Sequence, residues 1–147
     1  VLLAHPHMTA SGVVESAPLV LVDLETDQGL TGRSCVFCYT SIALKPIVEL
    51  IEALHPRIEG DAVAPLALAR KLQGGFRLLG PQGFTGIAMA GIDMAAWDLL
   101  AKSVGLSLTR LLGGEEKPIP AITVSGWLDQ TGRHEKRPSR ASWVSTA

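Results

Sequence analysis

Cysteine and histidine pairs with metal-binding spacing occur near the start of the sequence. Cys35 and Cys38 have the Cys-x-x-Cys spacing of zinc and thiol redox sites, and His5 and His7 flank a proline. The cysteines lie in an apolar, strand-like run where residues three apart point to opposite faces, and no third ligand accompanies the histidines. We therefore expect strand packing for the cysteines and exposed loop positions for the histidines, and we assign neither pair to a metal.

Two carboxylates, Asp93 and Asp98, could form an acid/base pair. They lie five residues apart in a strongly helical run, which places them on different faces of the helix. We expect Asp93 to be a buried hydrogen-bonding group and the nearby Trp97 to belong to the core. The sequence identifies no catalytic residue in this chain.

Charge and hydropathy argue against several classes of function. The 13 Lys and Arg residues nearly balance the 14 Asp and Glu residues, so no overall field attracts nucleic acid or a membrane surface. Charged residues interrupt each apolar run before the roughly 18 residues that span a bilayer. The mean hydropathy of +0.28 indicates an apolar face for a partner domain that is missing here. Only two cysteines are present, which favours a cytoplasmic location.

The elements that position these groups begin with a hairpin. Residues 17–26 and 30–39 are rich in aliphatic and β-branched side chains, and the turn between them contains Gly29. The two runs therefore predict an antiparallel pair of strands.

The sequence starts at Val1 without a signal peptide, and we expect it to be a piece of a longer protein.

Helical periodicity follows the hairpin. Apolar residues recur at helical spacing from residue 42 to 54, and Thr40 or Ser41 can cap the start of this helix. Pro46 lacks a backbone N–H, so we expect it in the first turn of a helix that begins later than the stripe suggests. Further helical segments are predicted at 65–79, 85–104 and 106–112.

The longest predicted helix carries a specific motif. Residues 86–102 read GIAMAGIDMAAWDLLAK, and Gly105 and the segment LLGG at 111–114 follow. This pattern closely resembles the helical signature of the mandelate racemase and muconate lactonizing branch of the enolase superfamily. Residues 17–24, together with Gly29, Gly32 and residues 43–45, are more similar to the mandelate racemases than to other members. The resemblance covers about residues 1 to 126.

The resemblance implies an α+β fold, with an antiparallel β-meander followed by a helical bundle. Residues 1–116 would form the capping domain, without its first strand, and 117–126 a linker entering a barrel domain that is absent here. In such enzymes barrel carboxylates hold magnesium, and barrel side chains remove the proton next to the substrate carboxylate. We therefore expect magnesium in the full-length enzyme and none bound by this chain.

The family's capping domain contributes two substrate-covering loops. By position these are residues 5–14 and 36–39. Tyr39 matches a tyrosine that reaches the substrate, Phe37 and Val14 would be apolar walls, and His7 and Thr9 would be further contacts. The pair His7-Met8 departs from the more apolar pattern of the family, which leaves the substrate open. Tyr39 could instead anchor the hairpin to a helix by burying its ring.

The implied parent is a racemase or dehydratase acting on a 2-hydroxy acid or sugar acid, a homo-oligomer that binds a small carboxylate substrate. The alternatives are a lyase of the lactonizing type, or a non-catalytic module acting by self-association or interaction.

Residues 127–147 have neither helical nor strand periodicity. Read one nucleotide later, residues 126–134 can encode GLIKPEDT, a helix start of the kind expected there. We therefore hypothesise a frameshift near Gly126.

Overall fold

The computed structural model describes residues 2–9 and 12–120, which form two compact units. One is a hairpin of β1 (Leu2–Thr9) and β2 (Gly12–Ser16). The other comprises 17–117 and contains the remaining elements. The predicted linker is described only as far as Pro120, without regular secondary structure, and the predicted tail and frameshift lie outside the described residues.

The larger unit is built on an antiparallel hairpin of β3 (Leu19–Glu25) and β4 (Thr31–Phe37). Inward and outward residues alternate along β3, as expected for a sheet with one covered face, so Val20 and Val22 are buried. Gly29, with φ of 79°, closes the turn. The predicted strands and turn are therefore confirmed.

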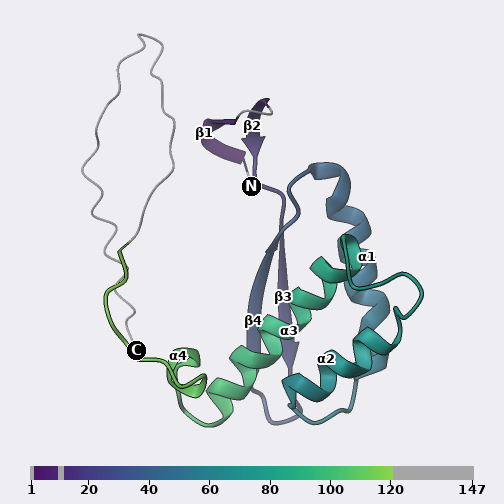
Figure 1. The fold of residues 1–147 in the computed structure, drawn as a ribbon, viewed down its shortest axis with the longest axis vertical. Helices are drawn as coiled ribbons and strands as arrows, with labels where there is room; N and C mark the ends of the chain where they lie inside the picture. Colours follow the sequence, from purple (N-terminus) through teal and green to yellow (C-terminus); the bar gives the residue numbers. More distant parts are fainter. Residues whose placement is uncertain (1, 10–11, 121–147) are drawn as a thin grey trace. The chain divides into compact units, whose positions relative to one another are not determined.

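Four helices follow: α1 (Ser41–Ile58), α2 (Pro65–Gly74), α3 (Phe84–Ser103) and α4 (Leu108–Leu111). In Figure 1, α3 crosses the β3–β4 hairpin, and α1 and α2 lie along the same side of it. The α+β class, antiparallel strands followed by helices, is confirmed. The strands form two separate pairs.

The helix boundaries differ from the predictions at two places. Thr40 caps α1, which begins at Ser41, so Pro46 lies inside the helix and not in its first turn. A proline inside a helix costs about 3 kcal/mol, and burial of the helix face that includes Ile47 offsets it. The second helix ends at Gly74 rather than at residue 79, because a run of turns begins at Gly75.

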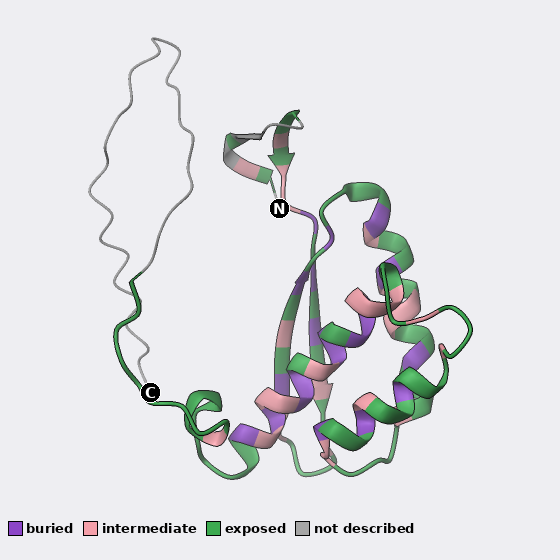
Figure 2. Ribbon diagram, viewed as in Figure 1, coloured by how far each residue is buried: buried purple, intermediate pink, exposed green. Residues whose placement is uncertain are grey.

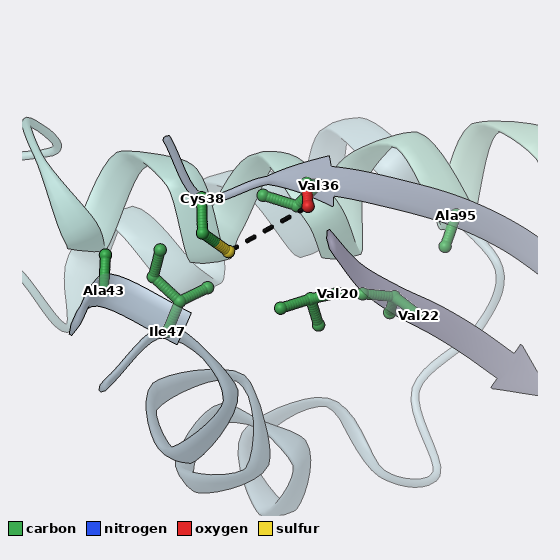
Figure 3. Packing of buried hydrophobic residues seen from close by; sticks show 7 residues of the cluster. All are labelled: Val20, Val22, Val36, Cys38, Ala43, Ile47 and Ala95. Carbon is green, nitrogen blue, oxygen red and sulfur yellow. Dashed lines mark hydrogen bonds between the residues drawn. The ribbon is translucent and has the colours of Figure 1, made fainter. Parts of the chain in front are cut away.

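The core lies between the hairpin and the helices. Figure 3 shows one buried cluster where β3, β4, α1 and α3 meet, formed by Val20, Val22, Val36, Cys38, Ala43, Ile47 and Ala95. A second cluster joins α1, α2 and α3 through Leu54, Leu72, Ala88, Met89 and Ile92. In Figure 2 the buried residues, in purple, recur along the helices and alternate with exposed residues. Trp97, expected in the core, is only half-buried, whereas the small residue Ala95 packs in the cluster with the hairpin.

Helix α3 is apolar around most of its circumference. Its length and a mean hydropathy of 1.3 are those of a helix that could span a membrane, although Asp93 and Asp98 interrupt its apolar run as the sequence indicated. The core helix of a soluble domain can have the same length and hydropathy, and 44% of this window is buried inside the fold. Packing against the hairpin, α1 and α2 accounts for this composition.

Candidate functional site

The connection between β4 and α1 is a strained turn centred on Tyr39. Its φ is 60°, and among the residues that the structure describes it is the one non-glycine residue with positive φ. The Thr40 N–H donates a hydrogen bond to the Cys38 carbonyl at 2.6 Å, which closes a three-residue turn around Tyr39. A bulky residue in this conformation costs about 1 kcal/mol or more, and such strain concentrates at functional sites.

Two aromatic rings project from this turn. Phe37 and Tyr39 lie with their ring centroids 4.9 Å apart at an interplanar angle of 53°. Tyr39 is 76% exposed and Phe37 is 40% exposed, so the alternative in which Tyr39 buries its ring is not what the structure shows. The structure thus brings two of the expected site residues together on an accessible surface.

Cys38, which lies between Phe37 and Tyr39 in the sequence, anchors the turn to the core. It is 1% exposed, its N–H donates to the Pro18 carbonyl at 2.9 Å, and burial raises the pKa of its thiol. Cys35 is exposed, so the two cysteines face opposite ways as expected. Within residues 2–9 and 12–120, no group of three His, Cys, Asp or Glu residues could hold a metal ion.

The other expected site residues lie in the β1–β2 hairpin. His7 pairs with Val14 across the two strands, and Thr9 pairs with Gly12 at the end of the hairpin. Val14 is half-buried. The expectation that His5 and His7 occupy a loop is wrong, because both lie within β1, where they are part of an eight-residue strand.

A polar network that the sequence analysis missed joins α3 to the outer edge of β4. The Arg33 N–H donates to Asp98 Oδ2 at 2.7 Å, and Lys102 Nζ donates to Asp98 Oδ2 at 2.6 Å and to the Thr31 carbonyl at 2.9 Å. An edge strand exposes unpaired backbone groups, and these side chains satisfy two of them. The four-residue spacing of Asp98 and Lys102 was the available signal.

The expectation that Asp93 is a buried hydrogen-bonding group is wrong. Its carboxylate is half-buried and forms no hydrogen bond in the described part of the chain, and burial raises its pKa. Burial would also raise the pKa of Asp98, but the hydrogen bonds from Lys102 and Arg33 and the charges of both residues outweigh it and lower the pKa. Only Asp98 lies near a strand edge that offers donors.

The strain at Tyr39 is testable without any assay of activity. We expect the Tyr39→Gly variant to exceed Tyr39→Ala in free energy of unfolding by about 1 kcal/mol, because both lack the ring and only glycine adopts positive φ without steric cost. Urea denaturation followed by circular dichroism measures the difference. At the helical control position, Ala67→Gly should instead lower stability by about 1 kcal/mol. Equal stability of the two Tyr39 variants would contradict the strained turn.

The chain is similar in sequence and structure to known enzymes. The model of the mandelate racemase / muconate lactonizing enzyme N-terminal domain matches residues 1–113. Among solved structures, the chain is similar to an enolase from Bradyrhizobium complexed with magnesium and mandelic acid, with 46% sequence identity and a TM-score of 0.76. That alignment covers 82% of this chain and 34% of the Bradyrhizobium protein.

Curated relatives include enzymes with different reactions. The chain is 32% identical over 114 residues to a D-galactonate dehydratase family member from Streptomyces sp. (strain SPB074), covering 70% of this chain and 23% of the relative. It is 30% identical over 127 residues to an L-Lys-D/L-Arg epimerase from Desulforapulum autotrophicum, covering 83% of this chain and 34% of the relative. The chain thus spans about a third or less of the proteins it resembles.

Proposed function

Because the chain belongs to the mandelate racemase / muconate lactonizing enzyme family, we propose that it is the substrate-covering domain of a magnesium-dependent racemase or dehydratase. The substrate is a 2-hydroxy acid or a sugar acid, from which the enzyme removes the proton next to the carboxylate. The observation that carries this proposal is the exposed Phe37 and Tyr39 pair on a strained turn. The magnesium and mandelic acid bound to the Bradyrhizobium enolase support the substrate class.

The proposed work of this chain is to bind and enclose the substrate. Tyr39 offers a hydroxyl that can donate a hydrogen bond to a substrate oxygen, and Phe37 beside it offers an apolar surface. Val14, His7 and Thr9 would contribute contacts from the β1–β2 hairpin. A cover that excludes water strengthens electrostatic interactions within the site, which aids proton removal next to a carboxylate.

The metal and the acid/base groups belong, in this proposal, to the part of the longer protein outside this chain. The described residues contain no suitable cluster of ligands, so they do not fit magnesium themselves. When bound, magnesium would stabilise negative charge that develops on the substrate carboxylate. We also propose that residues 117–126 lead into the barrel domain, and that the full-length protein is cytoplasmic and homo-oligomeric.

A comparison of the chain with the protein encoded by its complete locus tests this proposal. Sequencing the gene across and beyond the codon of Gly126 establishes the reading frame there and decides whether a frameshift is present. We expect the full-length protein, with magnesium, to racemise mandelate or dehydrate a sugar acid, and the 147-residue chain to be inactive. Polarimetry and detection of keto-acid products measure the two reactions. Turnover by the short chain would contradict our placement of the chemistry.

The role of the aromatic pair has a separate test in the full-length protein. We expect Tyr39→Ala to lower kcat/KM about tenfold, the loss of about 1.4 kcal/mol of transition-state binding. Tyr39→Phe should recover the part that depends on the ring and not the hydroxyl. Leu78→Ala is the control, because this side chain is fully exposed and lies outside the site. An unchanged kcat/KM in Tyr39→Ala on every substrate that the enzyme turns over would exclude the proposed contact.

The non-catalytic alternative rests on the exposed apolar residues of this chain. Leu21 is 77% exposed and Leu78 is fully exposed, as expected for a module that self-associates. Sedimentation velocity, combined with the activity assay, distinguishes the enzyme domain from the non-catalytic module. A stable oligomer of the short chain, together with a genuine stop codon at the locus, would favour the module.

A further inference from the structure

A pocket of about 270 Å³ lies between α2 and α3, outside the candidate site described above. Its walls are mostly aliphatic, and its polar groups are one carboxylate and one carboxamide. The lining residues are Leu68, Ala69, Leu72, Gln73, Pro81, Gly86, Met89, Ala90, Ile92 and Asp93. Small-molecule sites usually have about 300 Å³ or more, so this pocket suits a group the size of one long side chain.

Asp93 is the unusual member of this lining. The other half-buried carboxylate of α3, Asp98, is held by Arg33 and Lys102, whereas Asp93 has neither a hydrogen bond nor an ion pair within the part of the chain that the structure describes. The lysine of α2, Lys71, is bound to Asp61 at 2.7 Å. Partial burial disfavours the ionised form of this carboxyl of Asp93 and raises its pKa, and a cation in the pocket would favour the ionised form.

The shape and chemistry of the lining define the ligand. An aliphatic stem would displace water from Leu68, Leu72 and Met89, and a cationic head group would pair with Asp93. The amide oxygen of Gln73 is a second acceptor for a donor of that head group. We propose that this pocket binds an aliphatic cation, an alkylguanidinium or alkylammonium group, through the carboxylate of Asp93.

Such a group has two possible sources. It is an arginine or lysine side chain of a polypeptide segment, or it is a free amine of similar size. Both present the same stem and head group to the pocket. A side chain brings neighbouring backbone that contacts the rim, whereas a free amine brings none, so the relative affinities of two probes separate the sources.

Titration of the 147-residue chain with n-butylguanidinium, followed by two-dimensional ¹H–¹⁵N NMR, tests the proposal. We expect saturable shifts at α2 and α3 residues around the pocket, with a dissociation constant on the order of millimolar for so small a ligand. The neutral analogue n-butylurea has the same length and should bind at least about tenfold more weakly, because it lacks the charge that pairs with Asp93. This comparison needs no variant.

Variants then assign the effect to one carboxylate. Asp93→Asn should weaken n-butylguanidinium binding about tenfold, and it should fold because it removes a charge that burial disfavours. Glu52→Gln removes an exposed charge on α1 and should leave binding unchanged. Equal binding of the guanidinium and the urea, shifts elsewhere, or unchanged affinity in Asp93→Asn would overturn the proposal.

A second probe identifies the source. Acetyl-Ala-Arg-Ala-amide presents the same guanidinium on a backbone. Tighter binding of the peptide than of n-butylguanidinium supports a pocket for a polypeptide side chain, and tighter binding of the free cation supports a pocket for a small amine. Failure of both probes to bind at the pocket would overturn the proposal without affecting the proposed enzymatic role.

Discussion

Replacing Gly32 by alanine is expected to lower the free energy of unfolding by about 3 kcal/mol. Gly32 lies in β4 where α3 crosses the strand, and a Cβ atom there would overlap the Ala95 carbonyl oxygen and approach the Leu99 backbone nitrogen at 2.9 Å. Both groups belong to the helix backbone, so no side-chain rotation can relieve the overlap. Urea denaturation followed by circular dichroism measures the loss.

Gly74 provides the matched control for this variant. It is the last residue of α2, and a Cβ atom there would meet nothing within 4 Å. Gly74→Ala should therefore leave stability unchanged or raise it by up to about 1 kcal/mol, because alanine has less conformational freedom to lose in a helix. If Gly32→Ala proved as stable as Gly74→Ala, the close contact between β4 and α3 would be wrong.

The second large effect is expected at Asp98. Asp98→Ala should lower the free energy of unfolding by about 2 kcal/mol, because it removes the acceptor of two short hydrogen bonds and leaves the Arg33 N–H at the edge of β4 without its partner. The side chain is 32% exposed, and solvent screening reduces the contribution of its ion pair with Lys102. Asp98→Asn, which retains an acceptor, should lose about half as much.

The pH dependence of these variants has a defined sign. Folding lowers the pKa of Asp98 below its ordinary value, so its ionised form binds more strongly in the folded state. Its contribution is fully present above the unfolded pKa, near 3.8, and is lost as pH falls through the lower folded pKa. The stability difference between the wild type and Asp98→Asn should therefore be constant above about pH 5 and shrink below about pH 4.

Glu52→Gln is the control for the charge change at Asp98. Glu52 is exposed on α1, and its substitution should change stability by less than about 0.5 kcal/mol at any pH in this range. A difference for Asp98→Asn that stays constant down to pH 3 would show that the carboxylate does not act through its charge. Thermal denaturation at several pH values provides the measurement.

Local pattern was sufficient to predict much of the larger unit. Alternating apolar residues predicted β3 and β4 and helical periodicity predicted α1, because burial on one face requires those spacings. Helix start and stop signals predicted α2 and α3. The motif on α3 was sufficient to identify the family. The position of Pro46 was predicted incorrectly, since its intrinsic cost to a helix is local, whereas the packing of Ile47 that offsets it is not.

The residues of the candidate site were also predictable from the sequence, but their conformation was not. Phe37 and Tyr39 could be named from the resemblance, yet the positive φ of Tyr39 and the exposure of its ring depend on how Cys38 is anchored beside Pro18. The tilted contact between the two rings, on either side of Cys38 in the sequence, follows from that turn. No periodicity rule indicates such a turn, because strained backbone is held by its surroundings.

The sequence by itself determined the type and order of the elements, the position of the hairpin turn and the family to which the chain belongs. Only the tertiary structure decided which aspartate is paired, why Gly32 has no side chain and where an unpaired carboxylate remains. The physical reason is that these features join distant parts of the chain. The Asp98 carboxylate meets an N–H 65 residues away, and the closest contact of Gly32 is with the backbone of another element. Side-chain type and spacing determine local conformation, whereas such partners are fixed only when strand and helix pack together.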